Sequence, residues 1–367
     1  MKNINILTIL PTLNKCGGIE SFFMNYYKRL SSVFKVDFIT YECDSDVIAN
    51  QIESRNDNLY VFNRKNLKNF VEMQKEINNF FRKYHDYDIL HCQMANATFF
   101  FSKAAKKYNI NVRIMHSHQC KYADKLSHAI RNIPLIFLGK LESNYYLACG
   151  RDAGKFMFKG KKFDIINNAI DINRFKYDQQ IRDKKRKELD VLDSEILLGN
   201  IGRFCPQKNQ QFLCDLLFQL SQKNDKYKLL LIGSGEKKDE IVTKIKELRL
   251  ENKVIFIPST SNIEEYYQAM DCFLLPSLYE GLPVVGVEAQ INGLKTIFSH
   301  NITDEIKISD DAYFEKLDTN DWVNRIINQV DFSRNLEVNS DKFDISKQVT
   351  ILEEYYIKNL KNEGKKI

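Results

Sequence analysis

The sequence predicts an α/β protein made of two doubly wound domains that face each other across a cleft. The chain has 367 residues, a length that suits two domains of ordinary size better than one. Short apolar runs alternate with amphipathic helical segments, which is typical of βαβ units and a parallel sheet. The alternation stops at a charged stretch and then begins again, so each half of the chain is expected to form its own sheet.

The first half begins with a continuous apolar run at 4–10 that ends at a Gly-containing loop, followed by a segment of helical spacing at 18–30. An apolar run bounded by a turn signal is consistent with a buried strand. Further strand candidates lie at 35–42, 58–63, 87–93, 111–118 and 145–150, and a helix candidate lies at 66–84. We expect these elements to form a Rossmann-like domain over residues 1–175.

The same alternation starts again at 196–204, a strand candidate that is followed by a helix candidate at 209–222. The remaining strand candidates are 227–235, 253–258, 271–277 and 295–299, with a helix candidate at 236–248. The stretch between 175 and 190 is polar and charged, and we place the domain boundary there. A second Rossmann-like domain is expected over 176–345, and residues 346–367 are expected to form a C-terminal helix that crosses back to the first domain.

Composition and charge indicate a protein that can bury a full core and that does not bind nucleic acid. Hydrophobic residues make up 44% of the chain and charged residues 28%. The formal net charge of +6 permits contact with anionic lipid or with ligands that carry phosphate. Lys and Arg are interspersed with Asp and Glu rather than gathered in a basic stripe, so we expect no nucleic-acid partner. The sequence leaves the oligomeric state open.

The cysteines and the N-terminus indicate a cytoplasmic protein. The eight cysteines are scattered without a Cys-x-x-Cys pair, so we interpret them as reduced thiols and see no zinc framework. The apolar part of the first residues is short and runs into Pro11 and a Gly pair, unlike a signal peptide. No window of about 18 uninterrupted apolar residues exists, so no membrane-spanning helix is expected.

Gly17 and Gly18 lie in the loop 11–21, between the first strand candidate and the first helix candidate. A bare loop at the start of a helix can bring backbone N–H groups against an anion, and the helix dipole favours negative charge there. A tight turn that needs a positive φ is the alternative. The residues alone leave both interpretations open.

The loop after the strand candidate 196–204 carries two cations, Arg203 and Lys208, at the start of a helix. Two cations and a helix N-terminus can clamp a diphosphate, whereas two solvated surface charges are the alternative. The next strand ends in a Gly-rich turn, where Gly233 and Gly235 permit close approach of a ligand. Ligands bind beyond the carboxyl ends of parallel strands, which is where both loops are expected.

Two carboxylates, Glu280 and Glu288, flank seven residues in the stretch 278–290. Pro283 suits the first turn of a helix, because its missing N–H costs nothing there. Glu280 then lies in the loop before the helix, Glu288 lies near the second turn, and Gly281 leaves the backbone bare. Carboxylates in these places can accept hydrogen bonds from sugar hydroxyls at the two ends of a diphosphate. A capping Glu280 and a solvated Glu288 are the alternative.

The stretch "EGLPVVGVE" resembles the E-x7-E motif of retaining glycosyltransferases of family 4, which have the GT-B fold. Other segments occur in the order and spacing of that family: the Gly pair at 17–18, "GR…K" at 202–208, "IGSG" at 232–235, "LLPSLYEG" at 274–281 and "VEA" at 287–289. The segment "NAIDINRF" at 168–175 is similar to one that precedes the second domain in the family. The resemblance covers nearly the whole chain.

The resemblance implies a role for each motif. Arg203 and Lys208 would hold the diphosphate of the donor, and Glu288 would bind the ribose hydroxyls. Glu280 would face the transferred sugar. Gly17 or Gly18 would approach the phosphates from the N-terminal domain, which would be the acceptor side. The residues further expected to line the donor site are Gly233, Pro258, Gly281, Leu282 and Pro283.

The family also has a histidine at the end of the strand that corresponds to 111–118, near the donor sugar and the acceptor. This chain has two candidates, His116 and His118. We favour His118 as the catalytic residue, because it falls farther along the chain, past Ser117. His116 is the alternative, and an imidazole with a purely structural role is also consistent with the pattern.

The resemblance implies an enzyme that moves a hexose or N-acetylhexosamine from a nucleotide sugar, with UDP as the expected nucleotide, to a glycan or lipid-linked acceptor. Retention of configuration and a place in bacterial surface-polysaccharide synthesis follow from the family. Members need no metal and no cofactor, and none is expected here. Two other functions stay open: a nucleotide-sugar epimerase of the same fold, and a catalytically silent subunit that binds nucleotide sugar beside an active transferase.

The stretch 120–141 is expected to bring the protein to the inner face of an anionic membrane. It mixes the cations Lys121, Lys125, Arg131 and Lys140 with the apolar residues Leu126, Ile130, Ile133, Leu135, Ile136 and Phe137. A basic residue near an anionic surface contributes about 1 kcal/mol. Pro134 and Gly139 are expected to prevent one long amphipathic helix, so we predict peripheral, salt-sensitive binding without insertion. A helix that packs on the sheet is the alternative.

Overall fold

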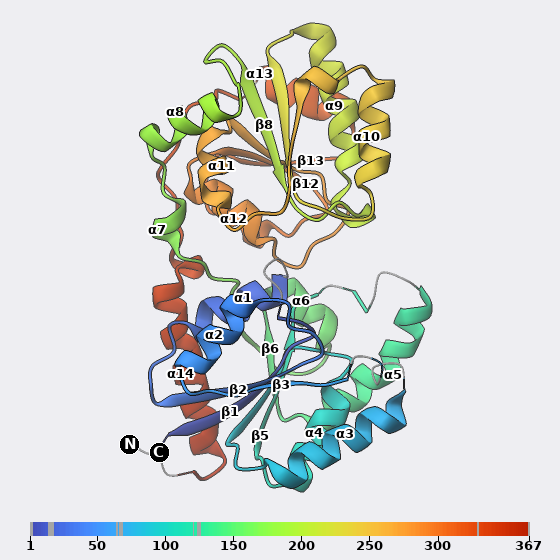
Figure 1. The fold of residues 1–367 in the computed structure, drawn as a ribbon, viewed down its shortest axis with the longest axis vertical. Coiled ribbons are helices and arrows are strands. Elements are labelled where there is room, and N and C mark those ends of the chain that lie inside the picture. Colours follow the sequence, from blue (N-terminus) through green and yellow to red (C-terminus); the bar gives the residue numbers. More distant parts are fainter. Residues whose placement is uncertain are drawn as a thin grey trace. The chain divides into compact units, whose positions relative to one another are not determined.

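The structure, a computed structural model, describes residues 3–13, 18–63, 65, 69–119, 121–122, 126–328 and 330–365. The chain forms two compact units, one of residues 1–169 with 345–367 and the other of residues 170–344 (Figure 1). Each unit contains a parallel sheet with helices on both faces. The predicted fold class, two doubly wound α/β domains, is therefore confirmed.

The first unit is built on a parallel sheet that is buried on both faces. In order across the sheet, its strands are β3 (Leu59–Val61), β2 (Phe34–Thr40), β1 (Ile4–Ile9), β4 (Ile89–Cys92), β5 (Val112–Ser117), β6 (Tyr145–Ala148) and β7 (Asp164–Ile165). Its helices are α1 (Gly18–Tyr27), α2 (Asp46–Ser54), α3 (Phe70–Lys83), α4 (Thr98–Lys107), α5 (Leu126–Glu142), α6 (Arg151–Met157) and α14 (Ile345–Asn362). Successive side chains of β1 point to opposite faces: Ile4 and Ile6 pack with α1, α2 and α14, whereas Leu7 and Ile9 pack with α3 and α4.

The second unit repeats this plan. Its parallel strands, in order across the sheet, are β10 (Val254–Ile257), β9 (Tyr227–Ile232), β8 (Ile196–Ile201), β11 (Cys272–Leu275), β12 (Lys295–Ser299) and β13 (Ala312–Glu315). Its helices are α7 (Ile172–Phe175), α8 (Gln179–Glu188), α9 (Gln210–Lys223), α10 (Lys238–Glu247), α11 (Ile263–Ala269), α12 (Val284–Ile291) and α13 (Thr319–Asn328). One apolar core joins the sheet to α9, α10 and α13, and a second joins it to α7, α11 and α12.

The strand order reverses at the same place in both sheets. In the first unit β1 lies between β2 and β4, and in the second unit β8 lies between β9 and β11. Helices that leave the carboxyl ends of the two neighbouring strands diverge to opposite faces at such a point. This divergence opens a crevice in which doubly wound proteins bind their ligands. The loops that follow β1 and β4, and those that follow β8 and β11, are therefore where a site is expected.

Helix α5 corrects one expectation, because it runs without a break although Pro134 and Gly139 both lie inside it. Pro134 is exposed, and so is Ile130, whose carbonyl loses its helical partner at the proline and can bond to water instead. Gly139 faces α4: a Cβ there would lie 3.2 Å from the backbone nitrogen of Phe99. The glycine thus allows close packing of the two helices rather than ending one of them.

The charged stretch near 175–190 forms α8 and packs as part of the second unit. Asp271 accepts hydrogen bonds from Arg182 Nη2 at 2.5 Å and from Arg186 Nη1 at 3.0 Å. It also accepts one from the backbone N–H of Leu197, on β8, at 2.7 Å. Strands β7 and β13 are additions to the predicted elements, and β7, with two residues, is too short to show a pattern in the sequence.

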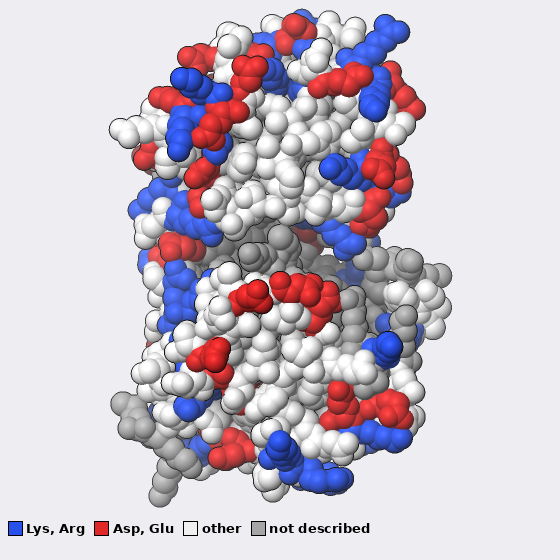
Figure 2. Space-filling view, in the orientation of Figure 1, with Lys and Arg blue, Asp and Glu red and all other residues white. Residues whose placement is uncertain are grey.

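Charged side chains of both signs are mixed over the face drawn in Figure 2. Neither the blue groups nor the red groups form a continuous stripe on either unit in that view. This is the distribution that interspersed Lys, Arg, Asp and Glu residues are expected to give. In the described part of the chain, every helix is too short or too polar to cross a membrane.

We expect Asp271→Ala to lower the free energy of unfolding of the second unit by about 3–5 kcal/mol, because it leaves the buried guanidinium of Arg186 and the partly exposed one of Arg182 without their carboxylate. The side chains of Asp271 and Arg186 are 8% and 4% exposed. Urea unfolding followed by the fluorescence of Trp322, the single tryptophan and a core residue of this unit, measures the change.

The matched control is Lys184→Ala, which removes an ion pair with Glu188 on the same helix whose side chains are 75% and 44% exposed. An exposed pair of this kind is worth less than about 1 kcal/mol. If Asp271→Ala lowers the free energy of unfolding no more than the control does, the hydrogen bonds of Asp271 do not hold α8 in place.

Candidate active site

Four loops of the second unit meet at one edge of its sheet. They follow β8, β9, β10 and β11, which are neighbouring parallel strands, so their carboxyl ends lie together. Backbone hydrogen bonds tie the loops to one another. The N–H of Phe204 donates to the Ser234 carbonyl at 2.9 Å, and the N–H of Leu278 donates to the Gln207 carbonyl at 2.8 Å. The predicted residues of these loops therefore belong to one bonded set.

Lys208 and Glu280 come into direct contact in this set. Lys208 Nζ lies 2.6 Å from Glu280 Oε1, and the two side chains are 17% and 9% exposed. Gln207 Nε2 donates to the other carboxylate oxygen at 3.2 Å. The chain reaches this position through the short 3-10 helix Pro206–Lys208 and through Asn209, whose left-handed φ of 52° turns it into α9. An ammonium has three donors, so Lys208 can hold Glu280 and an anion together.

Arg203 lies in the same loop but holds a different carboxylate. Its Nη2 is 3.0 Å from Glu236 Oε2, and the side chains are 71% and 51% exposed. An exposed pair of this kind contributes about 0–1 kcal/mol, so an anionic ligand can replace Glu236 at small cost. Arg203 and Lys208 thus sit on one loop, each with a carboxylate partner that a phosphate could displace or share.

Gly233 and Gly235 are required by the protein itself. Their φ angles are +149° and +156°, and a Cβ on Gly233 would lie 2.1 Å from the carbonyl oxygen of Gly202. A Cβ on Gly235 would lie 2.3 Å from the carbonyl oxygen of Phe204. The close approach of the two loops accounts for both glycines whether or not a ligand binds.

Glu288 is buried in the second turn of α12, and the exposed fraction of the residue is 6%. The hydroxyl of Tyr267, on α11, donates to Glu288 Oε2 at 2.8 Å. Burial raises the pKa of Glu288 to about 7, while the Tyr267 hydrogen bond and the charge of Arg174 act in the opposite direction. The carboxyl group is therefore poised between its neutral and charged forms near neutral pH.

These contacts overturn the alternative interpretation of the two acids. Glu288 is not solvated, and Glu280 does not cap α12, because Pro283 is the N-cap residue. Pro283 therefore lies just before the first turn rather than in it. Among the other predicted donor-site residues, Leu282 and Pro283 are buried, Gly281 is partly exposed and Pro258 is exposed.

In the first unit, Gly17 lies outside the described residues, and Gly18 is the first residue of α1. Gly18 is exposed, and no atom lies within 4 Å of the position of an added Cβ. It is not among the described glycines with a positive φ. A tight turn with positive φ is thus not found at Gly18, and its backbone lies open at the carboxyl end of β1.

His116 and His118 belong to a group of three stacked imidazoles, His91, His116 and His118, which we call the histidine cluster. The ring centroids of His91 and His116 are 5.2 Å apart, and those of His116 and His118 are 4.2 Å apart. Burial lowers the pKa of His91 and of His118 to about 3 and that of His116 well below its usual value. The three rings are therefore neutral near pH 7.

Hydrogen bonds connect the histidine cluster to β4 and to α14. His91 Nδ1 lies 2.7 Å from the Tyr356 hydroxyl, and His91 Nε2 lies 3.0 Å from His116 Nδ1. Gln93 Nε2 lies 3.1 Å from His91 Nε2, and Gln93 Oε1 lies 2.7 Å from His118 Nε2. Among the described residues, none is a hydrogen-bond partner of buried His116 Nε2.

The sequence-based prediction did not include His91, Gln93 or Tyr356. His91 and Gln93 could have been predicted, because they form a His-x-Gln pattern at the carboxyl end of a strand candidate, where polar residues point to a site. No such signal existed for Tyr356, which lies 265 residues from His91 along the chain. The contact depends on how α14 packs against the first unit.

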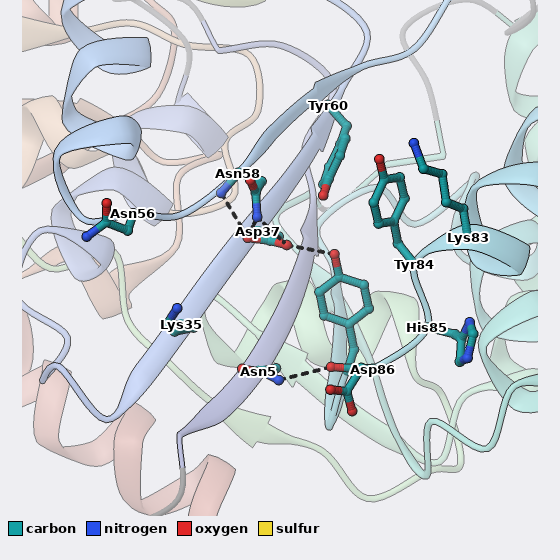
Figure 3. Close-up of a pocket in the computed structure, with 11 residues that line it drawn as sticks. Asn5, Lys35, Asp37, Asn56, Asn58, Tyr60, Lys83, Tyr84, His85 and Asp86 are labelled. Carbon is teal, nitrogen blue, oxygen red and sulfur yellow. Dashed lines mark hydrogen bonds between the residues drawn. The ribbon is translucent and has the colours of Figure 1, made fainter.

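A separate pocket of about 550 Å³ lies near the amino ends of the strands of the first unit (Figure 3). Tyrosine, asparagine, aspartate and lysine side chains line it, among them Asp37, Asn58, Tyr60, Lys83 and Tyr87. The Asp37 carboxylate is already engaged, because it accepts from the Tyr87 hydroxyl at 2.7 Å and from the Asn58 backbone N–H at 2.8 Å. None of the residues predicted for the site lines this pocket.

Two further observations concern metal binding and disulfide formation. Among the described residues, no group of three or more His, Cys, Asp or Glu side chains is arranged to bind a metal ion. The cysteines that the structure describes form no disulfide with one another, namely Cys43, Cys92, Cys149, Cys205, Cys214 and Cys272.

The stretch 120–141 presents a different surface from the one that its composition suggested. Ile136 is buried, and Lys140 Nζ donates to the Met157 carbonyl at 3.1 Å, so neither residue is available to a partner. Lys125 and the side chain of Leu126 lie outside the described residues. The exposed apolar residues of α5 are Ile130, Ile133, Phe137, Leu138 and Leu141.

Comparison with known proteins finds similarity to one family over part of the chain and to one fold over nearly all of it. Residues 181–307, which contain Lys208, Glu280 and Glu288, match the family model described as "Glycosyl transferases group 1". The fold is similar to that of Anabaena HepE, whose crystal structure in complex with UDP and glucose aligns with a TM-score of 0.82 at 18% identity, over 97% of this chain and 100% of that one. The chain thus has the GT-B fold, and residues 181–307 are similar to group 1 glycosyltransferases.

Two curated relatives are glycosyltransferases by name. The chain is 29% identical to the glycosyltransferase EpsF of Bacillus subtilis over 309 residues, which are 82% of this chain and 80% of EpsF. It is 26% identical over 218 residues to the UDP-Gal:alpha-D-GlcNAc-diphosphoundecaprenol alpha-1,3-galactosyltransferase of Escherichia coli, which covers 55% of this chain and 56% of that enzyme.

We expect Glu288→Gln to stabilise the protein in a manner that depends on pH. The pKa of Glu288 rises from 4.5 in the unfolded chain to about 7 in the folded protein, so the folded state binds more protons than the unfolded state between these values. Stability is therefore lost as pH rises through this window. Glutamine removes this loss, so the gain should be absent near pH 4 and reach about 3 kcal/mol above pH 7.

Urea unfolding at several pH values, followed by Trp322 fluorescence, measures this difference. Glu72→Gln, at an exposed position, is the control and should show no such trend. A stability difference between Glu288→Gln and the wild type that stays constant from about pH 4 to about pH 8 would contradict the assignment of a raised pKa.

Proposed function

We propose that the protein is a retaining, metal-independent glycosyltransferase. It moves a hexose or N-acetylhexosamine from a nucleotide sugar to a glycan or lipid-linked acceptor in the synthesis of a bacterial surface polysaccharide. The observation that carries the proposal is the contact of Lys208 with Glu280, 2.6 Å apart, where the strand order of the second unit reverses. A cation for phosphate and a carboxylate for sugar hydroxyls meet there, inside the span that matches group 1 glycosyltransferases.

In this proposal Lys208 and Arg203 hold the diphosphate of the donor. Helix α9 begins just after Lys208, and the N–H groups and dipole of a helix N-terminus favour an anion. Two cations and a helix end supply the positive charge that a divalent ion would otherwise provide to the leaving diphosphate. The reaction then needs no metal and no other cofactor.

Glu288 and Glu280 contact the other two parts of the donor, the ribose and the transferred sugar. Glu288 accepts hydrogen bonds from the ribose hydroxyls, and the Tyr267 hydroxyl fixes the orientation of its carboxyl group. Glu280 faces the transferred sugar. UDP is the proposed nucleotide, because the HepE structure was solved with UDP and glucose and the name of the Escherichia coli relative specifies UDP-galactose.

The first unit contributes Gly18 and the histidine cluster. The open backbone of Gly18, at the N-terminus of α1, suits contact with a phosphate. His118 is partly exposed at the end of β5, whereas His116 is fully buried beneath it. We therefore assign the contact with the donor sugar or acceptor to His118 and a supporting role to His116.

The exposed face of α5 supports an acceptor that is held at a membrane. Ile130, Ile133, Phe137 and Leu141 are 64%, 46%, 59% and 58% exposed. Their spacing of three or four residues places them on one side of the helix. An exposed apolar stripe of this kind marks an interaction surface, and exposed Arg131 adds positive charge beside it.

The occupant that we propose for this face is the anionic inner surface of the cell membrane. A lipid-linked acceptor would reach a cytoplasmic enzyme from there, and the printed name of the Escherichia coli relative specifies an acceptor with a diphosphoundecaprenol group. Apolar burial and attraction of Arg131 to anionic lipid would both contribute, as for other interfacial helices.

Incubation of the protein with radiolabelled nucleotide sugars and a bacterial lipid extract tests the function. We expect transfer of label to lipid from a UDP-sugar, and Lys208→Ala and Arg203→Ala should each remove most of it. Each variant loses one charge-assisted contact, worth about 1.5–3 kcal/mol, or roughly tenfold to a hundredfold in rate. Lys237→Ala, in the loop after β9, is the matched control and should keep its activity.

The same assay separates the alternatives. Formation of an epimer without transfer would identify an epimerase, and binding without turnover would identify a silent subunit. Transfer should survive EDTA and give a product with the anomeric configuration of the donor. Activity that is lost with EDTA and restored by magnesium, or an inverted product, would contradict the proposed mechanism.

We expect the protein to co-sediment with phosphatidylglycerol vesicles at low salt and to dissociate at high salt. Ile133→Ser with Phe137→Ser should reduce this binding about tenfold or more, because both side chains leave water on docking. Changing Lys121, Lys125 and Arg131 to Glu should weaken it through charge. Leu192→Ser, at a 62% exposed apolar position of the second unit, is the control. Unchanged binding in the α5 variants would exclude this face as the docking surface.

A further inference from the structure

The amide of Gln93 constrains two histidines at once. Gln93 is 2% exposed at the carboxyl end of β4, with its nitrogen 3.1 Å from His91 Nε2 and its oxygen 2.7 Å from His118 Nε2. An amide nitrogen can only donate a hydrogen bond, and an amide oxygen can only accept one. His91 Nε2 must therefore accept, and His118 Nε2 must carry a proton and donate.

The remaining protons of the cluster follow from this arrangement. A neutral imidazole has one N–H, so His91 carries its proton on Nδ1 and donates to the Tyr356 oxygen. His91 Nε2 also lies 3.0 Å from His116 Nδ1, so its single lone pair is shared between the Gln93 amide and the His116 N–H. His116 Nε2 is left as an unprotonated acceptor, in agreement with its burial without a partner among the described residues. Each observed contact in the chain has one donor and one acceptor.

Neighbouring rings hold these imidazoles in place, so the nitrogen that carries the proton is the main property that can still vary. Phe22 of α1 lies against both His116 and His118, with centroids 5.1 Å and 4.8 Å apart. His116 and His118 also stack on each other at 4.2 Å. Because the rings are held and neutral, their capacity to donate or accept depends on which nitrogen carries the proton.

We propose that Gln93 is a positioning residue that fixes His118 in the Nε2–H tautomer, so that His118 presents an unprotonated Nδ1 to a substrate hydroxyl. In this form His118 accepts a hydrogen bond from a hydroxyl of the donor sugar or of the acceptor and does not donate one. The inference rests on the proposed transferase function, in which His118 contacts one of these substrates. Tyr356 and His91 support Gln93 by keeping its nitrogen paired.

Histidine-selective ¹⁵N NMR of the free protein tests the tautomer directly, because protonated and unprotonated ring nitrogens have well-separated shifts. The chain has six histidines, and a His118→Asn spectrum identifies the signals of His118. We expect a protonated Nε2 and an unprotonated Nδ1 for His118 in the wild type.

Three variants distinguish a positioning role from a structural one. Gln93→Met keeps the shape but not the hydrogen bonds, so His118 should become a mixture of tautomers and kcat should fall about tenfold or more. Gln93→Glu still accepts from His118 Nε2–H, so the His118 tautomer should persist while His91 moves its proton to Nε2. Tyr356→Phe should alter the signals of His91 and leave the tautomer of His118 unchanged.

A wild-type His118 that is protonated on Nδ1, or a His118 whose signals do not change in Gln93→Met, would overturn the proposal. Equal loss of activity in Gln93→Met and Gln93→Glu with unchanged His118 signals would do the same and indicate a role in packing alone. The NMR result needs no substrate, so it decides the tautomer separately from the transfer assay. Absence of transfer in the wild type would count against the proposed function instead.

Discussion

In each unit the strand order reverses next to the strand that comes first in the sequence, β1 or β8. This reversal determines which side chains meet at the carboxyl edge of the sheet. In the second unit, β8 and β11 are neighbours whose following segments leave in different directions, and Lys208 and Glu280 come from those two segments. In the first unit, β1 and β4 are the corresponding neighbours, and they are followed by Gly18 and Gln93. Residues far apart in the sequence meet because parallel strands place all their carboxyl ends on one edge.

The two acids at the carboxyl edge of the second sheet have different hydrogen-bond partners. Glu280 is paired with Lys208 Nζ, 2.6 Å from its Oε1. Glu288 has a neutral phenol as its partner, and burial raises its pKa to about 7. Glu288 can therefore gain or lose a proton near neutral pH when a ligand binds. The first unit has the opposite arrangement, because its three clustered histidines are neutral and act through the direction of their hydrogen bonds.

Local pattern predicted most strands, because an apolar run followed by a turn signal is a property of neighbouring residues. It predicted β1 at 4–10 where the structure has Ile4–Ile9, and it missed β7, which has two residues. The E-x7-E spacing placed Glu280 before α12 and Glu288 within it. It could not show that Tyr267 buries Glu288 or that Lys208 binds Glu280, since those partners come from other segments. The expectation that Pro134 would break the helix was wrong. The exposure of Pro134 to water and the packing of Gly139 on α4 allow α5 to continue, and neither can be predicted from the local sequence.

The most distant of these partners is α14, which follows the second unit in the chain and packs in the core of the first. Its Tyr356 is the partner of His91 Nδ1, and Leu352 and Leu360 complete the apolar core beside β1 and α1. Without the hydroxyl, a buried imidazole N–H would lack a partner at a cost of about 1–3 kcal/mol. The arrangement of His91, Gln93 and His118 is therefore complete only when the end of the chain has folded onto the first unit. Packing of α14 thus affects both the stability of that unit and the hydrogen bond of His91.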